Sequence, residues 1–393
     1  MILEILLGSL LGILSLAVAY LYLLAAIGIF FRQTYREVRT PHRFLILVPA
    51  HDEEGGITRT IQSLQRMEYI DRAKIVVIAD NCTDKTASMA RTAGGTVLER
   101  TDPDNRGKGY ALEWALAQFD LDEYDAVAIV DADTLVEPNM LKAMTQSFEA
   151  GAGAVQCNYK LIAKSDSPIA YLVQMANAAE NILFYKPRGF LHLPVLLRGN
   201  GMAIKSSVLK AHPMDSHSIT EDVDYAVDLL KNGIRIDYSV ESTVRSPATT
   251  SYEQSYDQKL RWAAGTFSLI RSKGLPLVAL GLSRWRWDLL ELAGSFLLLS
   301  RPTLVYVALI ILAGSIWINP PYSLLFAGWC TGIILLLVLY LILGVFFVND
   351  KAATVRALLH TPFYAVWLAA VQIKALLKRG KLGWVRTKRD SHD

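Results

Sequence analysis

The sequence predicts an α/β domain with a largely parallel sheet, flanked at both ends by transmembrane and interfacial helices. Of its 393 residues, 52% are hydrophobic and 20% are charged, a mixture typical of membrane segments joined to a soluble domain. The middle of the chain alternates strand-like and helix-like stretches, which favours parallel strands with crossover helices. Long uncharged runs lie before and after that part.

The first uncharged run, residues 5–31, would form a helix about 40 Å long, enough to cross a bilayer with some tilt. A signal peptide is disfavoured, because the run is too long and only Glu4 precedes it as a charged residue. Four arginines follow it, at positions 32, 36, 39 and 43. The positive-inside rule therefore predicts a transmembrane helix over 1–32, with the N-terminus outside and the next segment in the cytoplasm.

The α/β pattern starts at Phe44 and continues to about Tyr238. The expected strands are 44–49, 74–80, 96–100, 126–130, 154–158 and 202–205, and the expected helices are 56–67, 84–93, 108–119 and 138–149. The turn after the first strand has the sequence P-A-H-D-E-E and no G-x-G-x-x-G fingerprint. A nucleotide could bind here, but not through the glycine-rich turn of the dinucleotide fold.

The Asp131-Ala132-Asp133 triplet follows the expected buried strand 126–130. Carboxylates at i and i+2 leave a strand on the same side, here at the strand end where open α/β sheets bind ligands. Mg²⁺ is commonly held by one or two carboxylates together with substrate phosphates. The triplet thus predicts a metal–diphosphate site, although an isolated D-x-D is more often an acidic turn that caps a helix.

Two further positions suit a nucleotide. Asp80 ends the second expected strand, where its carboxylate could accept hydrogen bonds from a base or ribose, while Thr83 or Asp84 would cap the next helix. Lys108 lies between two glycines at an expected helix start, where its ammonium and backbone N–H groups could meet a phosphate. By itself such a loop is more often a solvated turn.

An acidic cluster begins another expected helix. Ser218 and Glu221 have the spacing of a capping box, and an apolar stripe follows at helical spacing. Carboxylates in a first turn complement the helix dipole. A cap needs only one, whereas this stretch has Glu221, Asp222 and Asp224.

Further on, Gln258, Arg261 and Trp262 would share one face of a helix. A guanidinium can bind phosphate oxygens, and an indole offers a flat apolar surface. Anchoring of a helix at the membrane interface is the alternative role for this arginine and tryptophan.

Six motifs occur in one order: V-P-A-H-D-E-E, A-D-N-C-T-D, R-G-K-G, D-A-D, T-E-D at Thr220–Asp222 and Q-K-L-R-W at Gln258–Trp262. Together they resemble glycosyltransferase family 2, and within it the membrane synthases related to cellulose, chitin and hyaluronan synthases. The resemblance covers about residues 44–265, and T-E-D followed by Q-x-x-R-W is its most specific part. It implies a Rossmann-like GT-A fold, a nucleotide-diphosphate sugar donor, Mg²⁺ or Mn²⁺, and inversion at the anomeric carbon.

The resemblance also assigns roles to residues. The implied donor-binding residues are Pro49, Ala50, Glu53, Asp80, Lys108, Asp131, Asp133, Gln258 and Arg261, with Asp133 holding the metal. The implied catalytic residues are Thr220, Glu221 and Asp222, with Asp222 as the general base. The acceptor would meet Asn200, Gly201 and Trp262, and the gating loop that closes over the donor would contain Trp384, Arg386 and Thr387.

Two positions depart from the family pattern. Asp52 stands where the family often has Asn, and Asn81-Cys82 where it often has a glycine-serine pair, so the contacts with the donor base stay open. Cys82, Cys157 and Cys330 lie far apart and show no metal-ligand spacing.

The C-terminal part is expected to lie in and on the membrane. Residues 266–300 have the pattern of interfacial amphipathic helices, and two uncharged runs within 301–348 are each expected to span. The shorter apolar stretch 362–377 contains Gln372 and Lys374. If it spanned, the basic tail would face outside, so 352–393 is predicted to be an interfacial helix and a tail that could also bind anionic lipid.

These observations predict a multi-pass enzyme of the bacterial inner membrane, with a cytoplasmic glycosyltransferase domain over 40–265. It would transfer a hexose, most simply from a UDP-sugar, to a growing extracellular polysaccharide, with a second copy or an export partner completing the conduit. The alternative is transfer of one sugar to a polyprenyl-linked or other lipid acceptor. A membrane receptor for nucleotide sugars is disfavoured, because a binder has no use for a general base, and a net charge of +3 is too small to indicate nucleic acid.

Overall fold

The computed structural model describes residues 2–32, 37–163, 167–215, 218, 220–298, 300–318 and 322–377. The chain forms two compact units. The described residues of 37–163 and 188–248 form one, called the α/β unit, and those of 2–32, 167–187 and 249–377 form the other, called the helical unit. The gating prediction at Trp384, Arg386 and Thr387 and the basic tail lie outside the described residues.

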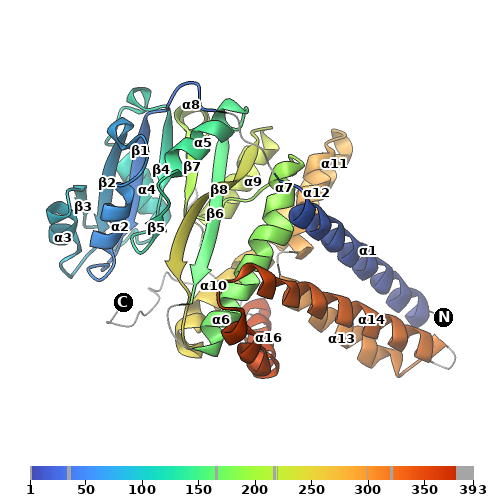
Figure 1. Ribbon diagram of the computed structural model, residues 1–393. Helices are drawn as coiled ribbons and strands as arrows, with labels where there is room; N and C mark the ends of the chain where they lie inside the picture. The colour runs from blue at the N-terminus through green and yellow to red at the C-terminus, as the bar shows by residue number, and fades with distance from the viewer. Residues whose placement is uncertain are drawn as a thin grey trace. The chain divides into compact units, whose positions relative to one another are not determined.

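The α/β unit is built on one sheet. Its strands among the described residues are β1 (Phe44–Ala50), β2 (Ala73–Asp80), β3 (Thr96–Arg100), β4 (Ala126–Ile129), β5 (Leu135–Val136), β6 (Ala154–Ile162), β7 (Met202–Lys205) and β8 (Ile236–Pro247). They are arranged in the order β3-β2-β1-β4-β7-β6-β8-β5 (Figure 1). β1 lies between β2 and β4, and all three are parallel, so the chain reverses its winding direction beside β1. Open α/β sheets bind ligands at such a point, outside the carboxyl ends of the strands.

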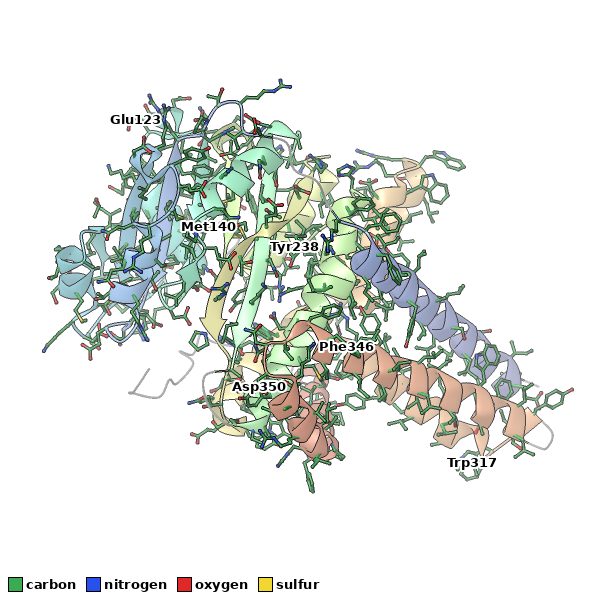
Figure 2. The ribbon with its side chains drawn as sticks, in the orientation of Figure 1. Glu123, Met140, Tyr238, Trp317, Phe346 and Asp350 are labelled. Atoms are coloured by element: carbon green, nitrogen blue, oxygen red, sulfur yellow. The ribbon has the colours of Figure 1, made fainter. Side chains whose placement is uncertain are left out.

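Helices cover this sheet. They are α2 (Ile57–Leu64), α3 (Thr86–Thr92), α4 (Lys108–Leu116), α5 (Met140–Glu149), α8 (Ser206–Ala211) and α9 (Glu221–Lys231), with 3₁₀ turns η1 (Ile70–Arg72) and η2 (Leu121–Glu123). α2 buries Ile57, Ile61 and Leu64, one every turn, which is the pattern that produces an amphipathic helix. α5 does the same from Met140, at its start in Figure 2, to Met144 and Phe148. These side chains join the inward residues of β1 and β4 in one core.

The observed sheet confirms the mixed α/β class and the predicted strands, but its second half combines parallel and antiparallel pairs. β7 runs antiparallel to both β4 and β6. β5 and β8 were not predicted. β8 carries Tyr238 in Figure 2 and lies between β6 and β5. It buries the polar residues Ser239, Ser242, Thr243 and Ser246. This strand therefore lacks the apolar pattern by which buried strands are recognised in a sequence.

The helical unit contains α1 (Ile2–Phe30), α6 (Pro168–Ala179), α10 (Tyr252–Leu269), α11 (Leu275–Ser283), α12 (Trp287–Leu298), α13 (Arg301–Ser315), α14 (Tyr322–Ile342), α15 (Lys351–Ala357) and α16 (Thr361–Leu377). Two π-helical segments, η3 (Glu180–Tyr185) and η4 (Ile270–Gly274), continue α6 and α10, and the 3₁₀ segments η5 (Leu343–Phe347) and η6 (Leu358–His360) follow α14 and α15. α7 (Lys186–Phe190) follows η3 and has residues in both units.

Within the described residues, two helices are long and apolar enough to cross a membrane: Ile2–Phe30 with 29 residues and Tyr322–Phe347 with 26. They lie side by side (Figure 1), and the Tyr22 hydroxyl donates to the Leu336 carbonyl at 2.8 Å. α13 has 15 residues, about 22 Å of helix, too short for a bilayer core of about 30 Å. It counts as part of a span only if α12 and α13 are taken together as one bent span, so the described residues contain two or three candidate spans.

Candidate functional site

The D-A-D triplet lies in a turn at the carboxyl end of β4. The strand ends at Ile129, and the Thr134 amide donates to the Asp131 carbonyl at 3.1 Å. The strand geometry expected for two carboxylates at i and i+2 is therefore wrong, because the chain has already left the sheet at Asp131. The turn nevertheless places Asp131 outside the strand ends, where the fold would bind a ligand.

Lys108 connects this turn to a second loop. Its ammonium donates to Asp131 Oδ1 at 2.5 Å and to the Gly199 carbonyl at 2.6 Å. Gly107, directly before it, has φ +132°, a backbone conformation that side chains rarely adopt, so the glycine lets the chain enter α4 with Lys108 as its first residue. The pairing of Lys108 with a carboxylate shows that it is not an ordinary solvated turn lysine.

The T-E-D motif lies at the start of α9. Thr220 is the N-cap, and Glu221 and Asp222 occupy the first turn. The predicted capping box is wrong: the Ser218 hydroxyl donates to the Asp224 carboxylate instead, and the side chain of the actual cap, Thr220, makes no capping bond. Val223 N–H donates to Asp222 Oδ1 at 2.8 Å, which fixes that carboxylate at the helix start.

Glu221 and Asp222 are adjacent, partly buried acids. Burial raises the pKa of Asp222 to about 6, against the opposing effects of the Val223 amide and the Lys108 ammonium. Burial and the negative charge of Asp222 raise the pKa of Glu221 to about 8. Burial disfavours the charge of Lys108, but the attraction of the surrounding carboxylates is stronger, and its pKa is raised. The pair therefore binds protons more readily than two ordinary carboxyl groups would.

The loop 198–201 lies between the two acidic motifs. Gly199 has φ +72°, and a Cβ added there would lie 3.0 Å from Asp222 Oδ2, so a side chain would both strain the loop and press on the acid. The same residue accepts the hydrogen bond from Lys108. Asp131, Lys108, Gly199 and Asp222 thus come together from four separate parts of the sequence.

The Asn200 side chain holds the D-A-D turn in place through hydrogen bonds. Its side-chain oxygen accepts from the Asp131 amide at 3.1 Å, and its amide nitrogen donates to Thr134 Oγ1 at 2.8 Å and Ser246 Oγ at 3.2 Å. Asn200 is only 1% exposed, and a Cβ added at Gly201 would meet the Val244 side chain at 2.6 Å. Both residues therefore position the loop in this structure, and their predicted contact with the acceptor stays a prediction.

Asp80 is held by a residue that the sequence reasoning missed. It ends β2 and is paired at 2.7 Å with Arg100 at the end of β3, and both side chains are buried. Arg100 also contacts Asp102 at 2.7 Å. The register of two parallel strands, in which Asp80 lies opposite Arg100, is the signal that could have found this pair. Arg100 therefore fixes the Asp80 carboxylate, a hydrogen-bond acceptor, at the carboxyl end of β2.

The remaining predicted donor residues lie at the adjoining end of β1. Pro49 and Ala50 are opposite Ile78 and Ala79 of β2. Glu53 accepts hydrogen bonds through its carbonyl from the Gly56 and Ile57 amides, so it shapes the turn into α2. All of the predicted donor residues before position 200 thus belong to the carboxyl ends of β1, β2 and β4 or to the start of α4.

Potential metal ligands gather at one other place in the described residues. Ligand atoms of Asp52, Cys82 and Asp84 lie within 4.8 Å of one another. Asp52 already accepts hydrogen bonds from the Thr83 and Asp84 amides, and burial raises the pKa of the Cys82 thiol to about 11. A protonated thiol does not suit Mg²⁺ or Mn²⁺, which prefer oxygen ligands. Asp133, a carboxylate at the strand ends with its oxygen near Thr134 Oγ1, fits such an ion better.

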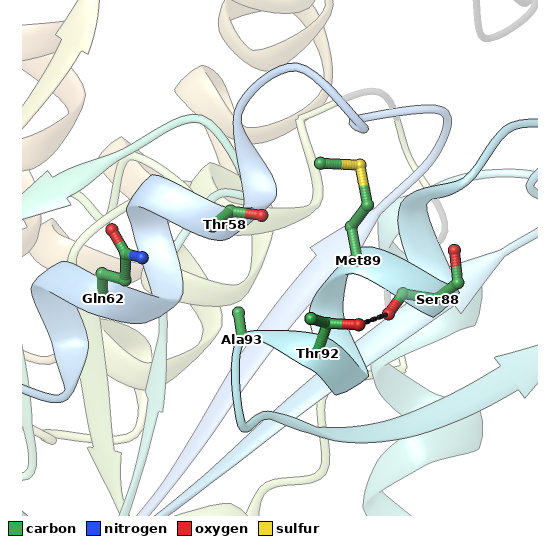
Figure 3. A pocket seen from close by; sticks show the side chains of 6 residues that line it. All are labelled: Thr58, Gln62, Ser88, Met89, Thr92 and Ala93. Atoms are coloured by element: carbon green, nitrogen blue, oxygen red, sulfur yellow. Dashed lines mark hydrogen bonds between the residues drawn. The ribbon is translucent and has the colours of Figure 1, made fainter.

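A further hollow lies elsewhere in the α/β unit. A groove lined by Thr58, Gln62, Ser88, Met89, Thr92 and Ala93 separates α2 from α3 and contains none of the predicted site residues (Figure 3). Gln258, Arg261 and Trp262 lie on α10, as predicted, but α10 belongs to the helical unit. There, the Lys259 ammonium lies 4.6 Å from the centre of the Trp262 ring, and the indole is 44% exposed.

Comparison with known proteins identifies the family. Residues 41–265, more than half of the chain, match the family described as "Glycosyltransferase like family 2". The chain belongs to glycosyltransferase family 2. The matched region contains every motif from the first strand end to Q-x-x-R-W, and the D-A-D and T-E-D motifs within it are those joined by Lys108 and loop 198–201.

Two bacterial proteins are similar to this chain at low sequence identity. Poly-beta-1,6-N-acetyl-D-glucosamine synthase of Staphylococcus aureus is 26% identical over 252 residues, which cover 60% of this chain and 59% of the synthase. The probable glycosyltransferase YdaM of Bacillus subtilis is 23% identical over 230 residues, covering 56% of this chain and 54% of that protein. This chain therefore matches less than two thirds of the length of these relatives.

Among solved structures, the mannosyltransferase PcManGT of Pyrobaculum calidifontis, in complex with GDP-Man and Mn²⁺, has a similar fold. The TM-score is 0.60 at 19% sequence identity, and the match covers 95% of this chain and 99% of that one. The likeness confirms the GT-A-like α/β fold with its apolar helices.

Proposed function

We propose that this protein is a membrane-bound, inverting glycosyltransferase that transfers a hexose from a nucleotide-diphosphate donor, most simply a UDP-sugar, to a growing extracellular polysaccharide. The observation that carries the proposal is the meeting of Asp131, Lys108 and Asp222 around loop 198–201. The family membership supplies the reaction class, and the synthase of Staphylococcus aureus, by its name, favours a polymer as product.

The residues of this cluster fit a direct displacement. An acceptor hydroxyl must lose a proton as it attacks the anomeric carbon, and a carboxylate placed to take it contributes about 10²–10⁴-fold. Asp222 suits that role, because a pKa of about 6 leaves it ionised at neutral pH yet basic enough to accept a proton. Burial and the charge of Asp222 raise the pKa of Glu221, so the pair disfavours a second negative charge beside Asp222.

The diphosphate leaving group would need positive charge on the opposite side. Lys108 supplies an ammonium beside Asp131, and loop 198–201 holds both in place. Asp133 is the residue of this turn that would hold Mg²⁺ or Mn²⁺, and such an ion, when bound, neutralises negative charge on the leaving diphosphate. Arg261 and Trp262 on α10 are proposed to serve the diphosphate and the acceptor sugar.

The proposed location is a bacterial inner membrane, with the N-terminus outside and the α/β unit in the cytoplasm. The two candidate spans and the arginines after α1 support it. The protein would work with membrane lipids around it, and a second copy or an export partner would be needed for a polymer conduit with so few spans.

The test is a donor screen by nucleotide release, followed by sizing of the product, with protein in detergent or nanodiscs. The proposal expects release with one nucleotide sugar, loss of release on chelation, and a long polymer. A single addition to a polyprenyl-diphosphate sugar would favour the alternative function. Nucleotide-sugar binding without release in the presence of either acceptor would contradict an enzymatic function.

A further inference from the structure

The helical unit contains a buried ion pair at the start of α13. Arg301, the first residue of that helix, is 7% exposed, and its Nη1 donates to Glu180 Oε1 at 2.7 Å. Glu180 begins the π-helical segment η3, and the guanidinium lies 4.5 Å from the Phe184 ring centre in the same segment. Charged side chains among apolar membrane helices are costly, and π-helical segments often mark functional sites.

In this ion pair only one nitrogen of the guanidinium, Nη1, donates to Glu180. Arg301 Nε and Nη2 are buried and have no hydrogen-bond partner among the described residues. These two nitrogens form one edge of the planar fork, the edge that binds two oxygens of a carboxylate or phosphate side by side. The hydroxyl of Tyr340, on α14, is likewise buried without a well-aligned hydrogen bond, and it lies within reach of the Arg301 side chain. Buried donors whose hydrogen bonds are unmade destabilise a protein, and charged donors do so more than neutral ones.

The charges around Glu180 leave an excess of positive charge. The Lys259 ammonium on α10 is also attracted by this carboxylate: burial lowers the pKa of Lys259 to about 8, and the attraction of Glu180 opposes that effect. Two cations therefore share one carboxylate. Arg301 in addition occupies the positive end of the α13 dipole, where an anion is stabilised and a cation is not. The imbalance favours a bound anion.

We propose that Arg301, Glu180 and Tyr340 form a site for the phosphate of a membrane lipid headgroup, which the Nε–Nη2 edge of Arg301 grips with two hydrogen bonds. Glu180 holds the guanidinium in position, and the Tyr340 hydroxyl donates to a third phosphate oxygen. A lipid is the fitting source of this phosphate, because Arg301 and Tyr340 lie on the apolar helices α13 and α14, which run side by side (Figure 1). The inference is independent of the proposed sugar transfer.

The experiment uses the full chain in detergent and native mass spectrometry with phosphatidylglycerol, and with diacylglycerol of the same acyl chains as the phosphate-free probe. Wild-type protein is expected to retain phosphatidylglycerol and not diacylglycerol. Arg301→Gln should reduce the affinity by about tenfold or more, and Arg301→Lys should restore only part of it, because lysine lacks the fork. Arg284→Gln, at an exposed arginine of the same unit, is the matched control and should bind as wild type does.

A second variant keeps the test decisive if Arg301→Gln fails to fold. Glu180→Gln keeps an oxygen that can accept from Arg301 Nη1 but removes the negative charge beside the bound phosphate, so it should bind phosphatidylglycerol as tightly as wild type or more tightly. Equal retention by wild type and Arg301→Gln would overturn the proposal, and so would an equal loss in Arg301→Gln and Glu180→Gln, which would mean a purely structural ion pair. Inorganic phosphate that displaces the lipid at the lipid's own concentration would overturn the lipid assignment.

Discussion

The two units of the molecule bury charge in opposite ways. In the α/β unit, one ammonium, Lys108, is surrounded by the carboxyl groups of Asp131, Glu221 and Asp222. In the helical unit, one carboxylate, Glu180, is shared by the cations Arg301 and Lys259. The first cluster has an excess of acid and the second an excess of base. Since buried charges tend to be paired, each imbalance indicates the sign of what the cluster would bind: a proton or metal ion in one case, an anion in the other.

The largest expected effect is at the acid-rich cluster. Asp222→Asn removes the carboxylate that would take the acceptor proton, so transfer should fall by about 10²–10⁴-fold while nucleotide binding changes little. The measurement is nucleotide release at saturating donor, with binding followed by calorimetry. Asp228→Asn, on the exposed side of the same helix, is the control. Turnover near the wild-type rate in Asp222→Asn would remove Asp222 from the mechanism.

The next effect is at the single cation of that cluster. Lys108→Met leaves Asp131 and the Gly199 carbonyl without their shared donor, and transfer should fall by about 10–100-fold, as for loss of one or two charge-assisted hydrogen bonds. Lys108→Arg should recover part of the rate. Kinetic constants for the donor would reveal the defect. If Lys108→Met and the exposed Lys142→Met are equally active, Lys108 has no part in the site.

A smaller effect is expected at two glycines, and it distinguishes a side-chain contact with Asp222 from backbone strain. Gly199→Ala and Gly233→Ala replace glycines of similar φ, +72° and +77°, but only the first added Cβ meets another residue, Asp222 Oδ2 at 3.0 Å. Both variants should lose about 1–2 kcal/mol of stability from the left-handed backbone. Only Gly199→Ala should also lose turnover. Equal turnover in the two variants would mean that loop 198–201 does not position Asp222.

The smallest expected effect is on stability as a function of pH. The pKa values of Glu221 and Asp222 are raised in the folded state, so the native protein binds these protons more tightly than the unfolded chain. That stabilisation is complete below the ordinary carboxyl range and is lost as pH rises through about 6 and about 8. Thermal unfolding of metal-free protein should therefore show a falling Tm from pH 5 to 9. Glu221→Gln should flatten the upper part of this decline, and the exposed Glu123→Gln should not.

Sequence reasoning predicted the α/β unit well where local pattern and chain order suffice. The strands β1 to β4 are apolar and short, and the residues at their carboxyl ends had to meet at one edge of the sheet. Lys108 and Asp131 were assigned to one site by resemblance, and in the structure Lys108 Nζ lies 2.5 Å from Asp131 Oδ1.

What the sequence could not predict depends on register and on long-range pairing. Arg100 acquires its role only because β3 lies beside β2 in a register that puts it opposite Asp80. The structural role of Asn200 was also not predicted: its side chain donates to Ser246 of the polar strand β8 and to Thr134 in the interior. Arg301 and Glu180 are far apart in the sequence, so no local sequence pattern predicts that they pair.

The most direct test of the account is the pH dependence of kcat/KM for the donor in wild-type protein, because it reports the titration of the catalytic groups in the free enzyme. The account predicts a rate that falls below pH about 6, as the Asp222 carboxylate takes up a proton, and that holds through neutral pH. A rate that stays constant from pH 5 to 7.5, under conditions where the protein remains folded, would contradict the assignment of Asp222 as the base.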